Sequence, residues 1–471
     1  MSNREKTVVL EKDIELQKNY IRQIRQYTQK LERTPVACVQ TFGCAQNEND
    51  SEKLKGMLLS MGYELGKEPE NADLILYNTC AVRAGAEDRV FGNLGALKNL
   101  KRKKEGLLIG ICGCMIQEKQ VVERLKSKYK HVDMVFGTHT FHKFPQILYE
   151  TLKEQHRVIA VEDSDGYLVE GMPQKREDPF KAGVSIMYGC NNFCSYCIVP
   201  YVRGRERSRE KEDILKECTQ LAQNGYREIT LLGQNVNSYG NDLNNGVDFS
   251  DLLREINRIE GIRRIRFMTS HPKDLSDKLI QTMAECENVC KYLHLPFQAG
   301  NNRVLQKMNR KYTKEHYLSL IEKVQKAMPD ITLTSDVIVG FPGETNEEFL
   351  DTLDVIRQVE FDSLYTFLFS PREGTPAAKM EDVLSHEEKQ KNFQTLVDLQ
   401  NQISKKKNDV YVGRTVAVLV DGVSKNNSRM MAGRTEGNKI VNFAAKGAEP
   451  GQIIPVRITK AQTWALIGEE E

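Results

Sequence analysis

Short apolar runs alternate with segments of helical spacing along most of this 471-residue chain. Between Pro35 and Ile159 the alternation occurs four times, and each apolar run ends in a turn-like sequence. Strands that alternate with helices of this length form βαβ units, and such units build a parallel sheet. The first part of the chain is therefore predicted to be an α/β domain. Its four strands are expected in the runs VACVQTFGC, ADLILYNTC, LLIGICGC and VDMVFG.

The same alternation resumes after a polar stretch that ends near Phe180. Six further apolar runs are separated by helical segments such as SREKEDILKECTQLAQNG. Six βα units without a strong antiparallel signal predict a partial barrel, a fold that carries its chemistry on the loops after the strands. The six strands are expected at Val184–Tyr188, Glu228–Gly233, Arg264–Ser270, Tyr292–Pro296, Thr332–Gly340 and Ser363–Phe369.

The end of the chain has a different pattern, with short strands and Gly or Asn turns from about Val410. This predicts a small antiparallel β-barrel. From Lys405 onward there are 11 Lys and Arg against 7 Asp and Glu, a local charge of +4 beside +2 for the whole chain. A small basic barrel suits an RNA backbone, although a cap on the preceding domain could have the same charge. The predicted organisation is a helical or frayed extension at 1–34, an αβ domain at 35–159, a partial (β/α)6 barrel at 176–408 and the small barrel at 409–471.

Three cysteines, Cys190, Cys194 and Cys197, form one C-x3-C-x2-C run directly after the first predicted barrel strand. No fourth cysteine or histidine lies close to the run in sequence. A structural zinc site is closed by four protein ligands, whereas three thiolates on an iron–sulfur cluster leave one metal position open. A cluster is the favoured interpretation, and the alternatives are a buried helix stripe or a zinc site with a distant fourth ligand.

Three more cysteines, Cys44, Cys80 and Cys114, each follow a predicted strand of the first domain, in the turns FGC, NTC and CGC. The carboxyl ends of parallel strands open on one edge of the sheet, so these thiols are expected to converge there. The alternative is that they are small buried hydrophobic residues. Spacing alone does not separate Cys114 from Cys112. Cys38, Cys218, Cys286 and Cys290 are expected to serve packing.

Composition excludes several classes of protein. The net charge of +2 identifies no partner, and no run of about 18 apolar residues is present to span a membrane. The charged N-terminus lacks the apolar region of a signal peptide. Eleven cysteines, an odd number, argue against a disulfide framework. A cytoplasmic protein with metal-binding thiols is therefore expected.

The cysteine run, with Tyr196 before its last cysteine, resembles the radical S-adenosylmethionine (SAM) superfamily. Together with Cys44, Cys80 and Cys114 in TFGCAQN, NTCAVR and GCM, it resembles the methylthiotransferase family of that superfamily. Further motifs extend the resemblance over about Pro35 to Ile467. Ala299, where many relatives have Ser, is a minor departure. The motifs are CIVPYVRGRERSR, LLGQNVNSYG, HLPFQAGN, MNRKYT, DVIVGFPGET and SPREGTPA.

The resemblance implies two [4Fe-4S] clusters. Cys190, Cys194 and Cys197 would hold the cluster that binds and cleaves SAM, and Cys44, Cys80 and Cys114 would hold an auxiliary cluster that delivers sulfur. The same resemblance selects Cys114, the cysteine of GCM, over Cys112. Two SAM molecules would be used per turnover, one for the radical and one for the methyl group. An electron donor such as flavodoxin or ferredoxin is implied as a partner.

Contacts to SAM are expected from Tyr196, Gln234, Gly340 and Arg203. Gln234 follows the second barrel strand, at the position that contacts SAM in related folds. Gly340 and Gly343 would let a cofactor approach the backbone closely, although an ordinary βα turn would also explain both glycines. The arginines of RGRERSR would contact the SAM carboxylate or RNA phosphate, and the alternative is a solvated charged face. They are Arg203, Arg205, Arg207 and Arg209.

The expected activity is insertion of a methylthio group at C2 of N6-(dimethylallyl)adenosine, the base at position 37 beside the tRNA anticodon. The small barrel resembles a TRAM domain and would bind the anticodon stem-loop. Rival substrates are threonylcarbamoyl-adenosine in tRNA and a ribosomal protein, and a rival class is an iron–sulfur electron carrier or an RNA-binding scaffold. Sequence does not fix the oligomeric state, and a monomer is the working expectation.

Overall fold

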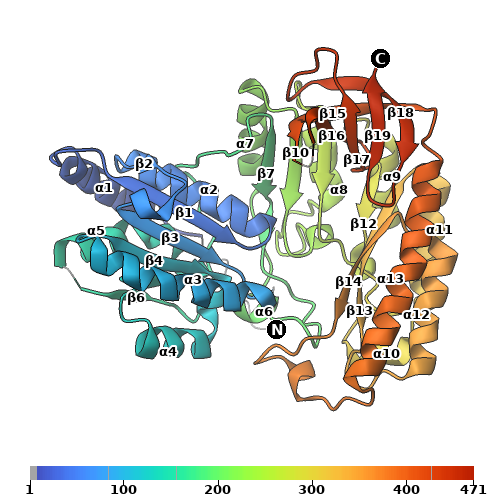
Figure 1. The fold of residues 1–471 in the computed structure, drawn as a ribbon, viewed down its shortest axis with the longest axis horizontal. Helices are drawn as coiled ribbons and strands as arrows, with labels where there is room; N and C mark the ends of the chain where they lie inside the picture. The colour runs from blue at the N-terminus through green and yellow to red at the C-terminus, as the bar shows by residue number, and fades with distance from the viewer. Residues whose placement is uncertain (1–7, 83, 155, 426) are drawn as a thin grey trace.

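The computed structural model describes residues 8–471, apart from residues 83, 155 and 426. The N-terminal domain, in blue and cyan, lies beside a larger barrel domain, and a small red barrel covers one end of the latter (Figure 1). The predicted N-terminal extension contains the helix α1 (Glu11–Thr28), which packs against the first domain through Ile21 and Ile24.

The N-terminal domain contains a six-stranded parallel sheet in the order β2-β1-β3-β4-β5-β6. The four predicted strands are confirmed, and two short edge strands, β2 and β6, were not predicted. The strands are β1 (Val36–Phe42), β2 (Glu64–Leu65), β3 (Leu74–Thr79), β4 (Leu108–Gly113), β5 (Met134–Phe136) and β6 (Val158–Ala160).

Helices cover both faces of this sheet, which explains why its central strands are apolar on both sides. α3 (Ala84–Lys103) and α4 (Lys119–Lys128) pack on one face through residues such as Leu94 and Leu125. α1, α2 (Ala45–Ser60) and α5 (Phe144–Glu154) pack on the other face. Short 3-10 helices are η1 (Pro69–Asn71), η2 (Cys114–Gln117) and η3 (Thr138–Lys143).

The second domain is a partial barrel of six parallel strands, as predicted. It consists of the sheets β11-β10-β7 and β12-β13-β14, which an isolated bridge between Ile265 and Val289 connects. The strands are β7 (Lys181–Ser185), β10 (Glu228–Leu232), β11 (Arg264–Phe267), β12 (Tyr292–His294), β13 (Thr332–Val339) and β14 (Ser363–Leu368).

One predicted strand, Val184–Tyr188, is wrong as a single element. The chain leaves the barrel sheet at Ser185, and β8 (Met187–Tyr188) pairs antiparallel with β9 (Arg207–Ser208) instead. β8 precedes the cysteine run and β9 follows it, so the pairing of these two strands holds the two ends of the loop together.

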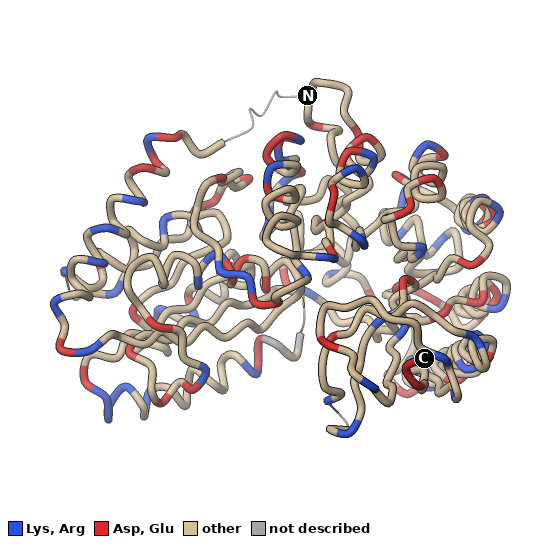
Figure 2. The backbone as a smooth tube through the Cα atoms, turned by 90° about the horizontal axis from the view of Figure 1, so that it is seen from above, with Lys and Arg blue, Asp and Glu red and all other residues tan. Residues whose placement is uncertain are grey.

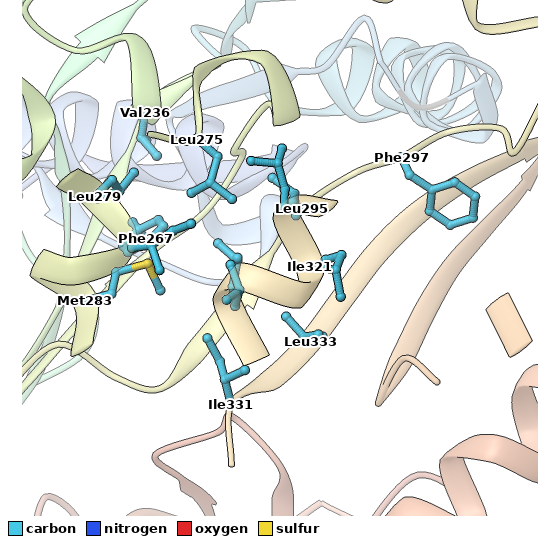
Figure 3. Close-up of a cluster of buried hydrophobic side chains, with 14 of the residues drawn as sticks. Val236, Phe267, Leu275, Leu279, Met283, Leu295, Phe297, Ile321, Ile331 and Leu333 are labelled. Carbon is cyan, nitrogen blue, oxygen red and sulfur yellow. The ribbon is translucent and has the colours of Figure 1, made fainter. Parts of the chain in front are cut away.

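A continuous hydrophobic core lies between the barrel strands and the surrounding helices. Leu295 and Leu333 from the barrel meet Ile321 of the helical layer in this core (Figure 3).

In the described part of the chain, seven helices surround the barrel strands. They are α7 (Lys211–Gln223), α8 (Phe249–Asn257), α9 (Asp277–Glu285), α10 (Asn302–Lys307), α11 (Lys314–Ala327), α12 (Asn346–Val359) and α13 (His386–Asp409). The loops contain the short helices α6 (Val199–Val202), η4 (Val236–Ser238), η5 (Pro272–Asp274) and η6 (Pro376–Lys379).

The C-terminal strands form a closed five-stranded barrel in the order β15-β16-β17-β19-β18. The predicted barrel is confirmed, but it is not wholly antiparallel, because β17 and β19 pair in parallel. Its strands are β15 (Thr415–Ser424), β16 (Asn427–Thr435), β17 (Ile440–Ala444), β18 (Ile453–Ala461) and β19 (Leu466–Glu470).

The C-terminal barrel is fastened to the starts of the partial-barrel strands. Arg264, the first residue of β11, donates hydrogen bonds to the carbonyls of Arg434 (2.7 Å) and Ala417 (3.0 Å). Arg266 donates to the carbonyls of Glu436 (2.7 Å) and Thr435 (2.8 Å) and also pairs with Glu228 at 2.9 Å. Because these arginines are buried, the two barrels share a polar junction that is closed to solvent at both side chains.

Acidic and basic residues are interspersed along the backbone of all three domains (Figure 2). Among the described residues, no helix combines the length and the hydrophobicity that crossing a bilayer requires.

Candidate functional site: two cysteine triads

Cys44, Cys80 and Cys114 lie immediately after β1, β3 and β4, three adjacent strands of the N-terminal sheet. The Cys80 thiol is within hydrogen-bonding reach of the thiols of both Cys44 and Cys114. The backbone N–H of Ala81 donates to the Cys114 sulfur at 3.1 Å. The predicted convergence of this first triad is therefore present in the fold.

Cys112 is separated from this group, although it is only two residues from Cys114. It is fully buried in β4 and belongs to the hydrophobic core beneath α2 and α5. Gly113, with a φ of 103°, turns the chain between the two cysteines, so that Cys114 begins η2 at the sheet edge. Packing also accounts for Cys38, Cys218 and Cys286, which lie in the domain cores, and for the buried Cys290.

A buried arginine, Arg203, accompanies the first triad. Its guanidinium pairs with Asp50 at 2.9 Å and lies close enough to Cys44 and Cys114 to favour their ionised forms. A hydrogen bond with the Cys80 thiol, aided by Arg203, lowers the pKa of Cys114, whereas the hydrogen bonds within the triad and burial raise the pKa of Cys44.

Cys190, Cys194 and Cys197 lie in the loop between β8 and α6, at the carboxyl end of the barrel. Ser195 anchors this loop, since its N–H donates to the Met308 carbonyl at 3.0 Å and its hydroxyl donates to the Lys307 carbonyl at 2.8 Å. Burial raises the pKa of the Cys190 and Cys197 thiols to about 12. These thiols therefore need a metal or a cation to become thiolates near neutral pH.

The two triads are connected by a short segment that follows Cys197 directly. Ile198 and Val202 pack with Cys80, Ala81 and Cys114 in a single buried cluster. The loop after β14 reaches the same place, because Arg372 donates a hydrogen bond to the Val82 carbonyl at 2.6 Å. Both triads thus border the seam between the N-terminal domain and the mouth of the partial barrel.

Gln234, Tyr196 and Gly340, which were predicted to contact SAM, all lie at this mouth. The Gln234 side-chain oxygen accepts a hydrogen bond from Gly189 N–H at 2.5 Å, just before Cys190. Tyr196 is half-buried and packs on the barrel core. Gly340 has a φ of 72°, and a Cβ there would lie 2.6 Å from Cδ of Lys389. The local fold therefore already requires a glycine at this position.

The interpretation of RGRERSR as a solvated charged face is wrong for three of its four arginines. Arg203, Arg207 and Arg209 are buried, and only Arg205 is exposed. Arg209 pairs with Glu170 at 2.5 Å and with Glu217 at 2.7 Å. The guanidinium of Arg207 hydrogen-bonds to backbone carbonyls, including that of Arg205 at 2.7 Å. Their alternation in sequence gave no indication of these interior partners.

Sequence reasoning missed an aromatic pair on the inner face of the edge strand β14. Tyr365 is 49% exposed and Phe367 is 51% exposed, although both belong to the barrel. The Tyr365 ring lies 5.7 Å from the ring of His294, which in turn contacts Asp336 at 3.4 Å. The Tyr-x-Phe spacing in SLYTFLF could have revealed the pair, because successive residues of a strand face opposite sides of the sheet. Leu364 faces the helices in the hydrophobic core, so Tyr365 and Phe367 must face the other side.

Glu344, which holds the loop after β13, makes the stability of this mouth depend on pH. Its side chain is 1% exposed and accepts a hydrogen bond from Gly340 N–H at 2.7 Å. Burial raises the pKa of Glu344 to about 7. An acid whose pKa is raised by folding destabilises the folded state once it ionises, so stability should fall as pH rises from about 4.5 to about 7.

We expect Glu344→Gln to remove this pH-dependent loss, since an amide oxygen can accept the same hydrogen bond. Above pH 7 the variant should be more stable than the parent by about 3 kcal/mol, and at pH 4.5 the two should be alike. Chemical denaturation across this pH range measures the difference. If the variant were more stable than the parent by the same amount at every pH, ionisation of Glu344 would not be the cause of the difference.

Each of the three domains matches a known protein family. Residues 36–137 match a family described as "Uncharacterized protein family UPF0004", residues 184–356 match the radical SAM superfamily, and residues 409–469 match the TRAM domain. Among solved structures, the radical SAM methyltransferase TsrM from Kitasatospora setae has a similar fold. Its TM-score is 0.53 at 15% identity, over 73% of this chain and 75% of that chain.

Relatives of known function match the whole chain. The tRNA-2-methylthio-N(6)-dimethylallyladenosine synthase of Acetivibrio thermocellus is 55% identical over 450 residues, which are 96% of this chain and 93% of the relative. The enzyme of the same name from Alkaliphilus oremlandii is 52% identical over 469 residues, which are 100% of this chain and 99% of the relative.

Proposed function

Because this chain belongs to the tRNA-2-methylthio-N(6)-dimethylallyladenosine synthase family of the radical SAM superfamily, we propose that it is a tRNA methylthiotransferase. It converts N6-(dimethylallyl)adenosine at position 37, beside the anticodon, to the 2-methylthio derivative. The observation that carries this assignment is sequence identity above 50% along the entire length of such enzymes. Two cysteine triads bordering one seam provide independent structural support.

The residues present fit a [4Fe-4S] cluster at each triad. Each site offers three free thiols, the donors that iron–sulfur clusters use. Within the described residues, no three His, Cys, Asp or Glu side chains are arranged to hold a single metal ion. Cys190, Cys194 and Cys197 would hold the cluster that binds SAM, and Cys44, Cys80 and Cys114 would hold the auxiliary cluster.

The chemistry requires cofactors because no acidic or basic side chain can break the C2–H bond of adenine. When bound, the clusters and SAM supply the electron, the hydrogen-abstracting radical, the sulfur and the methyl group. The protein itself positions the two triads across the packed Ile198 and Val202 side chains and excludes water from that contact. Two SAM molecules are used per turnover, and an external donor of the flavodoxin or ferredoxin type supplies electrons in the cytoplasm.

The TRAM-like barrel supplies part of the RNA-binding surface. Lys425 is exposed at the turn after β15, Arg429 is exposed near the start of β16, and Trp464 is 58% exposed before β19. Cations that neutralise phosphates and an aromatic face that stacks on a base are the usual elements of single-strand RNA recognition. The unpaired bases of an anticodon loop are suited to such recognition.

The direct test is nucleoside analysis of tRNA from a strain that lacks the gene. Loss of the 2-methylthio group from N6-(dimethylallyl)adenosine, with accumulation of the unmodified base, is expected. Normal levels of the modified nucleoside would refute the proposal. Loss of a methylthio group from threonylcarbamoyl-adenosine or from a ribosomal protein would redirect it to the corresponding substrate.

Tyr365 and Phe367 should contribute to binding of the substrate base. Their exposed rings lie inside the partial barrel, on the same side of the sheet as His294 and Asp336. Stacking of a base on an aromatic ring contributes about 1–3 kcal/mol, so Tyr365→Ala should raise the KM for tRNA by a factor of about 5 to 160. Tyr365→Phe, which keeps the ring, serves as the matched control. An unchanged KM in both Tyr365→Ala and Phe367→Ala would contradict this role.

A further inference from the structure

Arg310 lies against the cysteine loop of the partial barrel, and its guanidinium makes three kinds of contact. It donates hydrogen bonds to the sulfur of Cys194 at 3.4 Å, to the carbonyl of Pro296 at 2.8 Å and to the hydroxyl of Tyr312 at 3.0 Å. Its residual exposure is 7%. Arg310 is thus a buried cation with one of its N–H groups directed at a sulfur of the second triad.

The partners of Arg310 differ from those of the buried arginines Arg203 and Arg266, which form ion pairs. Arg203 pairs with Asp50 and Arg266 with Glu228, so a carboxylate compensates each of these charges. Arg310 instead donates its hydrogen bonds to a thiol, a carbonyl and a hydroxyl. A buried cation costs several kcal/mol unless an anion compensates it. Of its three contacts, the Cys194 sulfur is the one that would carry negative charge as a cluster ligand.

The turn that carries Arg310 also holds the backbone of the same loop. The side-chain amide of Asn309, whose φ is 58°, donates to the Phe193 carbonyl at 2.8 Å. The Met308 carbonyl accepts from Ser195 N–H at 3.0 Å. The residues on both sides of Cys194 are therefore fixed by the segment Met308–Arg310, which places the guanidinium in a defined position relative to the sulfur.

We infer that Arg310 is a positioning residue for the cluster held by Cys190, Cys194 and Cys197, an inference that rests on the proposed function. It directs a charged N–H···S hydrogen bond to Cys194 and compensates the negative charge of the thiolate-bound cluster. A cluster with three thiolates gains further negative charge when it accepts an electron. A nearby buried cation stabilises the reduced form more than the oxidised form, and Arg310 therefore raises the reduction potential.

The experiment uses the full-length chain in the background Cys44→Ala/Cys80→Ala/Cys114→Ala, so that only the second triad can carry a cluster. Arg310→Gln removes the charge, and Arg310→Lys keeps the charge without the fixed guanidinium geometry. Arg264→Gln is the matched control, because Arg264 is equally buried in the barrel but donates to carbonyls of the C-terminal barrel. The readouts are iron content after anaerobic reconstitution and reductive titration followed by electron paramagnetic resonance.

Arg310→Gln should make the midpoint reduction potential of the cluster more negative. The equilibrium constant for its reduction should fall at least tenfold, which corresponds to about 59 mV for one electron. Arg310→Lys should shift it less, and Arg264→Gln should leave it unchanged. A lower cluster content in Arg310→Gln that Arg310→Lys restores would support the inference as well. Iron content and potential both equal to those of the parent in Arg310→Gln would overturn it. A parent that binds no iron would instead overturn the proposed function, and the role of Arg310 with it.

Discussion

Cys194→Ala should reduce both SAM cleavage and tRNA methylthiolation to the detection limit. Cys194 is the most buried cysteine of its triad and the one that Arg310 contacts, and its thiol is one of the three that would hold the cluster. The reaction depends wholly on cofactor chemistry, and loss of a cluster ligand removes that chemistry rather than weakening it. The measurements are 5′-deoxyadenosine formation under reducing conditions and iron content, which should fall from about eight to about four atoms per chain.

Cys286→Ala provides the matched control for this variant. Cys286 is also a buried barrel cysteine, but it packs in the hydrophobic core at the end of α9. Its replacement should leave iron content and SAM cleavage at parental levels. Full iron content in Cys194→Ala, or SAM cleavage that survives the change, would exclude this triad as the radical-generating site.

The triple variant Cys44→Ala/Cys80→Ala/Cys114→Ala should separate the two halves of the reaction. It should still form 5′-deoxyadenosine, because the second triad is intact, but it should transfer no methylthio group to tRNA. Ile198 and Val202, which follow the second triad in sequence and pack against Cys80 and Cys114 of the first, remain in place. Iron content should again fall by about half. Mass spectrometry of the tRNA nucleosides and quantification of 5′-deoxyadenosine measure the two activities in one sample.

Cys112→Ala tests the assignment of ligands in the first triad. This cysteine is two residues from Cys114 in sequence but is packed in the core beneath the sheet. The variant should keep its iron and its methylthiolation activity, with only a modest loss of stability from the smaller side chain. Loss of methylthiolation in Cys112→Ala, together with normal activity in Cys114→Ala, would show that the assignment is reversed.

The arrangement of strands and thiols could be predicted because both follow from local patterns. Apolar runs fixed β1, β3 and β4, and the parallel-strand rule then placed Cys44, Cys80 and Cys114 at one edge. The rule does not depend on which residues pack between strands and helices. The same rule predicts that the C-x3-C-x2-C loop lies at the mouth of the partial barrel, because the loop directly follows a barrel strand.

Features that depend on distant partners could not be predicted. The burial of Arg203, Arg207 and Arg209 requires acceptors such as Asp50 and Glu217, which are remote in sequence. The end of β7 at Ser185 depends on its partner strands, and hydrophobic pattern cannot locate it. Arg310 occurs in a motif that resembles an ordinary charged turn, and only the fold brings its guanidinium to Cys194.

The attachment of the C-terminal barrel by Arg264 and Arg266 has a consequence for substrate size. These arginines stand at the starts of the strands, whereas the cysteine loop stands at the carboxyl ends. An eight-residue strand such as β13 spans about 26 Å. A free nucleoside cannot bridge that length, but an anticodon arm can. Under the proposed function we therefore expect a free nucleoside to be a poor substrate, because it cannot contact the cysteine loop and the C-terminal barrel together, whereas an anticodon arm can.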